Sequence, residues 1–359
     1  MSGAADARTS ARTNVVSTTE REITTPVDLC TPDGAALNPA ARGWSRVPMH
    51  RANLIGHAGT NKRWDYWAVL AGDVVVSTVF ADLDRFGLAD VWWVDLRDGT
   101  SGGLAILVPG EDGNRLPDTP GRAPLVVQRD GLDLAITDDD HATYLRASWT
   151  EPDGRAGLLD VAVERPPHLE SCNVVIPWSD ELFNFTSKQQ ARPAHGSLSV
   201  GDRTWAIGQP DGVDSWGVLD VGRGRWPSHI AWNWGGGAGR CGARVVGLQF
   251  GAKWTAGTGF TENAIVVDGR LTKIGRELDW QYEWDDPMRP WRVVDPGGQL
   301  DVELTPRFDK HSKVDISEDL GSETHQVFGT WSGWLVDDDG VEVSIDGLQG
   351  FAEEARQRW

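Results

Sequence analysis

The residue types best suited to chemistry gather between residues 219 and 240, in LDVGRGRWPSHIAWNWGGGAGR. One carboxylate, Asp220, stands there among arginines and tryptophans around a glycine-rich bend. If this group is buried, Arg223 and Arg225 hold the Asp220 carboxylate ionised, because a nearby opposite charge lowers the pKa of a carboxyl group. The pattern therefore predicts an aromatic site with a fixed negative charge.

A second carboxylate, Glu262, follows in the threonine-rich segment GAKWTAGTGFTENAIVV. A carboxylic acid that an apolar pocket keeps neutral can protonate a double bond, and indole faces stabilise the positive carbon that forms. Because Asp220 is expected to stay ionised, we predict Glu262 as the proton donor. The predicted substrate-binding residues fall into two groups. Tryptophans form the aromatic wall, and cationic or amide side chains bind a polar end of the substrate. The residues are Trp226, Trp232, Trp234, Arg223, Arg225, Lys188, Lys253 and Asn263.

Glu323 and His325 form a smaller cluster, with His311 upstream. Residues two apart on a strand point to the same face, so Glu323 and His325 are predicted to shuttle protons as a pair. Metal binding by these three residues is an open alternative, but no third ligand stands at a characteristic spacing. The prediction is a site without metal or cofactor.

Two glycine motifs resemble catalytic or cofactor signatures but lack the required context. Residues 99–103, GTSGG, match the GxSxG nucleophile pattern, yet they lie between two strand-like runs and predict a hairpin. Residues 237–242, GAGRCG, match GxGxxG, but a strand-like run follows where a helix is needed. The sequence also contains neither a GKS/T phosphate loop nor HExxH.

The elements that must position these groups are strands, because short apolar or alternating runs bounded by Gly, Asp and Pro recur throughout the chain. Asp268-Gly269 predicts a two-residue hairpin, and residues 337–340 predict another turn. Only the closing GFAEEARQRW, residues 350–359, predicts a helix. The expected strands cover residues 74–80, 91–96, 104–108, 132–137, 144–149, 158–163, 216–221, 230–234, 244–250, 263–267, 270–274, 302–305, 326–331 and 341–345.

So many strands exceed one small barrel, so the sequence predicts an all-β protein with two antiparallel barrels, or a barrel pair sharing a wall, and a short C-terminal helix. The expected division is a disordered tail over residues 1–28, a first barrel over 29–165 and a second over 166–359. The boundary falls at Arg165-Pro166-Pro167. The second barrel carries most of the candidate site residues.

Composition restricts the partners of the chain. Its 359 residues carry a net charge of −19, which repels nucleic acid and anionic lipid. Three cysteines without CxxC spacing fit a reducing cytoplasm, and no apolar run is long enough to span a membrane. The 19 tryptophans indicate large rigid surfaces. The predicted partner is an apolar small molecule, while its identity and the oligomeric state stay open.

Several long blocks occur in the order CNVVIPWSDELFNFTSKQQARPAHGSL, LDVGRGRWP, WNWGGGAGR, GAKWTAGTGFTENAIVVDGRLTKI, HQVFG and GFAEEARQRW. With DGAALNPAARGWSRVPMHRANL and FADLDRFGLADVWWVDL, they resemble the domain-of-unknown-function family 2804 over residues 29–359. More distantly, the chain is similar to the lipocalin-like superfamily of carotenoid 1,2-hydratases, tocopherol cyclases and some Diels–Alder cyclases. That resemblance implies a double β-barrel acting on apolar molecules, and it assigns no catalytic residue.

Three functions fit these observations. The first is a cofactor-independent hydratase, isomerase or cyclase acting on an isoprenoid- or polyketide-like molecule in a tryptophan-lined barrel mouth. The second is a non-catalytic carrier for a lipid or isoprenoid. The third is a glycan-active enzyme that stacks sugars on tryptophan, with Asp220 and Glu262 as its carboxylate pair. A closed apolar cavity argues against the third function.

Overall fold

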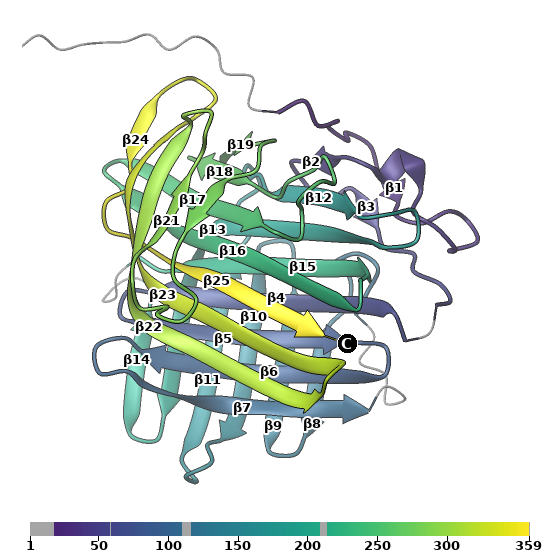
Figure 1. Cartoon of the computed structure of the whole chain (residues 1–359). Coiled ribbons are helices and arrows are strands. Elements are labelled where there is room, and N and C mark those ends of the chain that lie inside the picture. Colours follow the sequence, from purple (N-terminus) through teal and green to yellow (C-terminus); the bar gives the residue numbers. More distant parts are fainter. Residues whose placement is uncertain (1–17, 58, 110–115, 209–213, 359) are drawn as a thin grey trace, which may run out of the picture.

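The computed structural model describes residues 18–57, 59–109, 116–208 and 214–358. Within these ranges the chain forms strands and one short 3-10 helix, η1 (Pro39–Ala41). The strands build two large sheets, with a small parallel pair of β1 (Val27–Asp28) and β3 (His50–Arg51) beside them (Figure 1). The predicted all-β class is confirmed: each large sheet is antiparallel and curls into a half-barrel.

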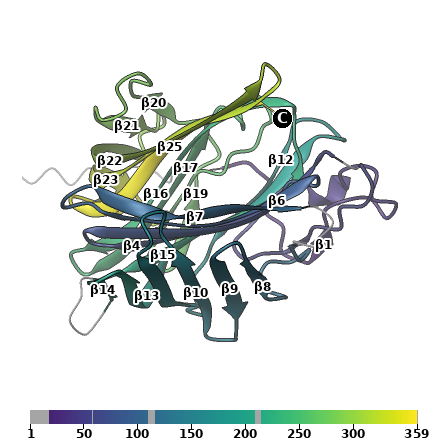
Figure 2. The ribbon, with the colours of Figure 1, turned by 90° about the horizontal axis from the view of Figure 1, so that it is seen from below.

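The first sheet has thirteen strands, and its main path runs β7-β6-β5-β4-β15-β13-β11-β10-β9-β8. Figure 2 shows that it folds over, so that β8–β11 form one layer and β4–β7 another. Apolar side chains from both layers form its core. Its strands are β2 (Trp44–Ser45), β4 (Asn61–Ala71), β5 (Val74–Asp82), β6 (Phe86–Asp95), β7 (Thr100–Pro109), β8 (Leu125–Arg129), β9 (Leu132–Asp138), β10 (Ala142–Thr150), β11 (Ala156–Glu164), β12 (Cys172–Pro177), β13 (Phe183–Val200), β14 (Arg203–Ile207) and β15 (Trp216–Arg225).

The second sheet has ten strands in the order β19-β18-β17-β16-β25-β23-β22-β21-β20, with β24 attached to β23. It curls around its own core, which includes Trp291 and Trp331. Its strands are β16 (His229–Cys241), β17 (Arg244–Ala252), β18 (Ala264–Val267), β19 (Arg270–Lys273), β20 (Asp279–Gln281), β21 (Trp291–Val294), β22 (Leu300–Ser317), β23 (Leu320–Val336), β24 (Glu342–Ser344) and β25 (Leu348–Arg358).

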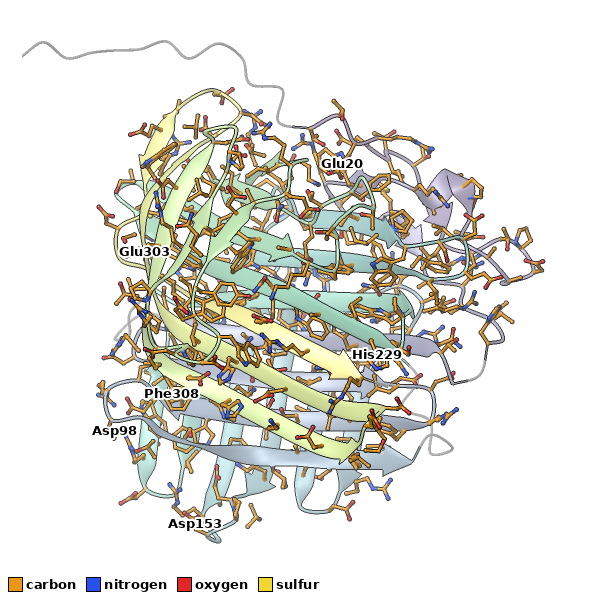
Figure 3. All side chains as sticks on the ribbon, viewed as in Figure 1. Glu20, Asp98, Asp153, His229, Glu303 and Phe308 are labelled. Carbon is orange, nitrogen blue, oxygen red and sulfur yellow. The ribbon has the colours of Figure 1, made fainter. Side chains whose placement is uncertain are left out.

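The two sheets pack against each other through the outer face of the β4–β7 layer, which lies between the other layers in Figure 2. Strand β4 illustrates how this layer packs on both of its faces, because successive residues point alternately into the first core and toward the second sheet. Trp67 and Val69 point into the first core, whereas Ala68 and Leu70 point toward Phe351 of the second sheet. Apolar side chains occupy much of this interface, where Phe308 of β22, labelled in Figure 3, packs near Trp92 of β6.

The expected C-terminal helix is wrong, because residues 348–358 form strand β25. This strand lies between β16 and β23 and pairs with both. Phe351 packs between the sheets while Ala352 packs in the second core, so the segment buries side chains on both faces. A single helix turned toward one core leaves half of these positions in solvent. Pairing on both sides overrides the local preference for a helix.

The predicted strands fall on observed strands, but the sequence pattern misses eleven other strands of the described residues, namely β1–β4, β8, β12–β14, β20, β21 and β25. Asp268 and Gly269 form the predicted hairpin between β18 and β19, with positive φ angles of 50° and 85°. The GxSxG match lies at the β6–β7 hairpin, as predicted. The GxGxxG match lies at the β16–β17 hairpin, also without a following helix.

The sheets divide the chain at a place different from the predicted boundary near residue 165. Strands β12–β15 belong to the first sheet, although they follow that boundary, and the second sheet begins with β16. Within the expected tail, the carboxyl group of Glu20 is buried beside Lys273 of the second sheet, whereas Val27–Asp28 forms β1 and pairs with β3. Residues 1–17 lie outside the described part. The division into domains stays a prediction.

Two further findings concern the chain as a whole. All three cysteines are free thiols, and Cys30 and Cys172 are buried. In the described ranges, no helix is of a length and apolarity that would carry it across a membrane.

Candidate active site between the two sheets

A cavity of about 280 Å³ lies where the β4–β7 layer faces the second sheet. Alternate residues of β4 and β16 point into it, so that Trp64 and Tyr66 face Trp232 and Trp234. Trp226, just after β15, packs against the rings of Trp64, Trp178, Trp232 and Trp254. The other lining residues are Val79, Ala81, Leu83, Leu88, Thr186, Lys188, Asp220, Glu262 and Glu353.

Lys188 of β13 carries the positive charge of the cavity. Its Nζ lies 2.9 Å from Oδ1 of Asp220 and 3.2 Å from Oε2 of Glu262, and all three groups are buried. The ammonium also lies 4.5 Å from the ring centre of Trp234. Burial lowers the pKa of Lys188, but the two carboxylates outweigh burial, so that the pKa is raised and the ammonium stays charged at neutral pH.

Each carboxyl group in the cavity accepts a hydrogen bond from an indole N–H. This bond fixes the carboxyl orientation and ties it to the aromatic wall. The three pairs are Trp64 to Asp220 at 3.2 Å, Trp254 to Glu262 at 2.8 Å and Trp232 to Glu353 at 2.7 Å. Hydrogen bonds therefore join each acid to the aromatic wall.

Glu353 of β25 is the third acid that lines the cavity. Among the described residues, no lysine or arginine nitrogen forms an ion pair with its carboxyl group. Burial raises the pKa of Glu353 to about 7, although the Trp232 N–H and the charge of Lys188 oppose the rise. A carboxyl group with this pKa is partly protonated at neutral pH, so Glu353 can donate a proton there and take one back.

Glu262 has a similar pKa in a different setting. Burial raises its pKa to about 7, while the charge of Lys188 opposes the rise and that of Asp220 adds to it. Because Lys188 contacts its carboxyl group, the ionised form of Glu262 has a partner that Glu353 lacks. Glu262 therefore reaches the same pKa of about 7 with a cation beside it.

The backbone around Glu262 is held by hydrogen bonds from its neighbours. The amide of Gly251 donates to Oδ1 of Asn263 at 2.7 Å, and Nδ2 of Asn263 donates to the carbonyl of Arg276 at 2.9 Å. The thiol of Cys172 lies 3.6 Å from the carbonyl of Glu262. Asn263, predicted to bind substrate, thus holds the loop that presents Glu262.

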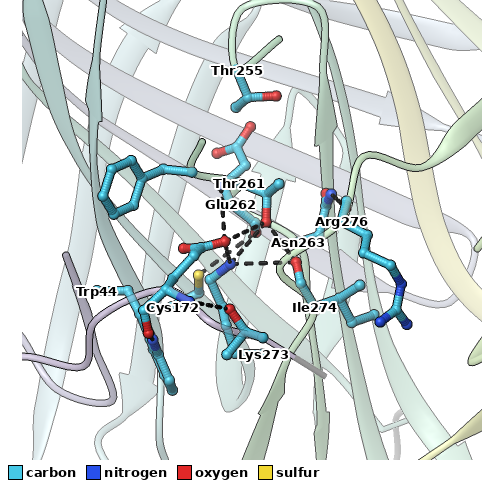
Figure 4. Close-up of polar contacts among 12 residues, drawn as sticks. Trp44, Cys172, Thr255, Thr261, Glu262, Asn263, Lys273, Ile274 and Arg276 are labelled. Atoms are coloured by element: carbon cyan, nitrogen blue, oxygen red, sulfur yellow. Dashed lines mark hydrogen bonds and ion pairs between the residues drawn. The ribbon is translucent and has the colours of Figure 1, made fainter. Parts of the chain in front are cut away.

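A buried ion pair continues this support toward the N-terminal segment. Nζ of Lys273 donates to Oε1 of Glu20 and to Oγ1 of Thr261, each at 2.8 Å (Figure 4). The Thr261 hydroxyl donates in turn to the carbonyl of Ile274. Residues far apart in the sequence therefore fix the position of Thr261 and, with it, of Glu262.

The expected pairing of Asp220 with arginines is wrong. Arg223 binds Oδ1 of Asp65 at 2.7 Å, and Arg225 donates to the carbonyls of Gly34 and Ile55. Strand alternation explains this result, because Asp220 is an odd number of residues from either arginine and points to the other face. Both arginines lie outside the cavity and brace the first sheet, while Lys188 is the cation beside Asp220.

The remaining predicted site residues also lie outside the cavity. Nζ of Lys253 binds Oε1 of Glu354 at 2.6 Å, near the surface of the second sheet. The rings of His311 and His325 stack at 4.2 Å, and His311 contacts Glu323 at 3.2 Å. The ligand atoms of these three residues lie within 4.8 Å of one another, on β22 and β23. A proton shuttle between them and the cavity acids would have to cross the sheet.

The sequence patterns do not single out Glu353, Trp64, Tyr66 or Trp254 as cavity residues. Glu353 falls within the predicted helix, although the period-two pattern Phe351, Glu353, Ala355 could have indicated its face. Of the predicted site residues, Trp232, Trp234, Asp220 and Glu262 line one cavity, whereas Arg223, Arg225 and Lys253 do not. The cavity lies between the sheets and not in a barrel mouth.

Comparison with known proteins identifies a family but no reaction. The model of a family described as "Domain of unknown function (DUF2804)" matches residues 20–359, and no curated protein matches. Three solved structures are similar, each at 12% identity. They are CghA (93% of this chain and 97% of that chain, TM-score 0.48), kievitone hydratase from Nectria haematococca (83% and 89%, 0.45) and a putative AttH from Nitrosomonas europaea (82% and 92%, 0.43). At these scores they carry no argument about function.

Proposed function

The chain belongs to the DUF2804 family of unknown function, and we propose that it is a cofactor-independent enzyme that transfers protons to and from an apolar small molecule between its two sheets. The observation that carries the proposal is Glu353, a buried carboxyl group with a pKa of about 7 that faces a tryptophan-lined cavity. The reaction class is that of a hydratase, isomerase or cyclase.

The proposed reaction begins with Glu353 in its protonated form. Glu353 gives its proton to one carbon of a substrate double bond, and the other carbon becomes positive. The faces of Trp232 and Trp234 stabilise that charge through the negative potential of their rings. The cation then loses a neighbouring proton, closes on a nucleophile of the same molecule or captures water. In each case one proton is released, either to Glu353 itself or to Glu262, and in the second case Glu353 takes a proton from solvent while Glu262 gives one up, so the acid is regenerated.

Lys188, Asp220 and Glu262 supply the polar end of this site. Glu262 is placed to accept a proton, since Lys188 favours its ionised form. The ammonium of Lys188 also offers a contact for a carbonyl or hydroxyl oxygen of the substrate. We assign the donor role to Glu353 in place of Glu262 because Glu353 has no direct counter-charge to hold it ionised.

A non-catalytic carrier for an apolar molecule is the second candidate, because the cavity by itself explains binding. The glycan-active alternative is disfavoured: Asp220 and Glu262 approach the same ammonium, and the walls around them are aromatic and aliphatic. A glycosidase instead needs its two carboxyl groups on either side of a sugar bond.

Deuterium transfer from solvent tests the proposal even though the substrate is unidentified. The purified protein is incubated in D₂O with an apolar cell extract, and compounds that gain carbon-bound deuterium, or the elements of D₂O, are found by mass spectrometry. The wild type is expected to label a small set of compounds, and Glu353→Gln is expected to label none while keeping its fold. Glu354→Gln, which changes the neighbouring residue on the opposite face of β25, is the matched control and should keep the labelling.

A ligand that copurifies unchanged, with no labelling by the wild type, would instead establish the carrier. Labelling by Glu353→Gln at the wild-type rate would remove Glu353 from the donor role. The cytoplasm remains our prediction for the compartment, because the three cysteines are free thiols.

A further inference from the structure

A second cavity, of about 550 Å³, lies inside the first curled sheet. Strands β4 and β15 separate it from the proposed active site, because successive residues along each strand point alternately into one cavity and into the other. Tyr66 and Asp220 face the active site, whereas Trp67 and Leu219 line this second cavity. Leu125 and Ile136 add further apolar surface to its wall.

Arg192 of β13 lines this cavity and is 2% exposed. Its Nε donates to the carbonyl of Glu164 at 2.8 Å, and its Nη2 donates to the carbonyl of Val163 at 3.0 Å. Oγ1 of Thr143 and Oε1 of Gln189 accept two more hydrogen bonds, each at 3.2 Å. All of these acceptors are uncharged, and the guanidinium carbon lies 4.8 Å from the ring centre of Trp67.

A bulge in β13 directs this side chain into the cavity. The register of β13 against β15 shifts between Gln189 and Arg192, and Ala191 has a φ of 56°. Positive φ is unfavourable for alanine, and bulges often redirect a side chain next to a functional site. The local backbone is therefore strained at the position that orients Arg192.

In the described part of the chain no carboxylate forms an ion pair with Arg192, although the charge of Asp138 attracts it from beyond ion-pair distance. Among the carboxylates that line the cavity, Asp65 pairs with Arg223 and Asp138 with Arg165. Burial and the nearby Arg165 lower the pKa of Arg192, but a guanidinium stays charged at neutral pH. The remaining lining carboxylates are Asp139 and Asp140, which are exposed at the rim, and Glu170, which pairs with Arg46.

We propose that this second cavity binds a small amphipathic anion, an organic carboxylate or sulfonate whose charged group pairs with Arg192 and whose apolar body packs on Trp67 and Leu219. A buried cation that forms no ion pair with the described residues, beside the apolar wall of Trp67 and Leu219, is the environment that such a ligand completes. The acids at the rim are in water, where salt screens their repulsion. This site is independent of the proposed reaction, because it lies on the other side of the sheet.

Two fluorescent probes that differ by one charged group test the proposal. They are 8-anilino-1-naphthalenesulfonate, an anion, and N-phenyl-1-naphthylamine, its uncharged parent. The full chain is titrated with each probe at constant ionic strength. The wild type is expected to prefer the anion, and Arg192→Met should weaken anion binding at least about tenfold while changing neutral-probe binding less than about twofold. Arg146→Met, which removes an exposed cation on the outside of β10, is the control and should change neither.

If Arg192→Met does not fold, the same titrations are made with Arg192→Lys. Lysine keeps the charge but cannot make the four hydrogen bonds that hold the guanidinium in the cavity, so anion binding should weaken at least about threefold. Equal affinity of the wild type for the two probes, or no saturable binding of the anion, would overturn the proposal. So would unchanged anion affinity in a folded Arg192 variant, because the probe would then occupy a place other than this cavity.

Discussion

Trp232 and Glu353 lie on the neighbouring strands β16 and β25, and the indole N–H of Trp232 donates to Oε1 of Glu353 at 2.7 Å. The same ring forms part of the aromatic wall, so the proposed acid and the surface that would stabilise a cation are tied together. The bond favours the ionised form of Glu353, whereas burial favours the neutral form. Their balance leaves the pKa of Glu353 at about 7, where a group can both donate and accept protons.

Replacing Trp232 by Phe tests this balance. The variant keeps an aromatic ring in the wall but removes the N–H donor, so the pKa of Glu353 should rise above 7. Carbon-13 NMR titration of the glutamate carboxyl groups, assigned with Glu353→Gln, measures the change. Trp234→Phe is the control, because the Trp234 N–H donates to Gln249 and not to a carboxylate. A pKa of Glu353 that is equal in the wild type and Trp232→Phe would contradict the proposed balance.

The stability of the Glu353→Gln variant should depend on pH in a defined direction. The pKa of Glu353 is raised from 4.5 to about 7, so its protonated form stabilises the fold below pH 4.5, and this contribution is lost as pH rises through 7. Such a shift corresponds to at most about 3 kcal/mol. Relative to the wild type, Glu353→Gln should therefore gain stability between pH 5 and pH 8, as measured by urea unfolding.

Glu354→Gln should show the opposite trend. Burial raises the pKa of Glu354, but hydrogen bonds from Lys253, Tyr282 and Arg356 outweigh burial, and the pKa is lowered. Its stabilising contribution is present above the unfolded pKa and is lost as pH falls through the folded value. The two variants share a strand, so parallel trends would show that the pH dependence does not come from these carboxyl groups.

Lys188→Met should destabilise the protein strongly. The change leaves Asp220 and Glu262 buried beside each other without their shared cation, which costs about 3–5 kcal/mol when one partner of a buried ion pair is removed. Urea unfolding at pH 7 measures the loss, and lower pH should reduce it because protonation neutralises the carboxyl groups. Lys313→Met, which removes an exposed lysine of β22, should change stability little. Similar losses for both variants would rule out a special role for Lys188.

Gly251→Ala should displace Glu262, because an added Cβ at residue 251 would lie 2.0 Å from Oε1 of Glu262. The carboxyl group would have to leave its hydrogen bond with Trp254, at a cost of about 1–3 kcal/mol for overpacking. Thermal unfolding and tryptophan fluorescence measure these effects. Gly239→Ala is the matched control, since its nearest neighbour would be 3.4 Å away. Wild-type stability and spectrum in Gly251→Ala would show that Glu262 is not held as the structure has it.

Local pattern in the sequence determines much of the fold. Alternation and turn residues predict most strands and the hairpin at Asp268 and Gly269, because side chains on a strand alternate and Asp-Gly tolerates positive φ. The same alternation places Trp232 and Trp234 on one face and is consistent with both lining the cavity. These properties depend on neighbouring residues only, so the chain need not be folded to reveal them.

Tertiary structure alone decides which charged groups meet. Asp220 could have paired with arginines three and five residues away, but the sheet turns those side chains to its other face and places Lys188 beside Asp220. Glu353 reaches the cavity only because the last strand pairs with both β16 and β23. The local pattern of GFAEEARQRW is also compatible with a helix, and the hydrogen bonds that exclude the helix come from strands distant in the sequence.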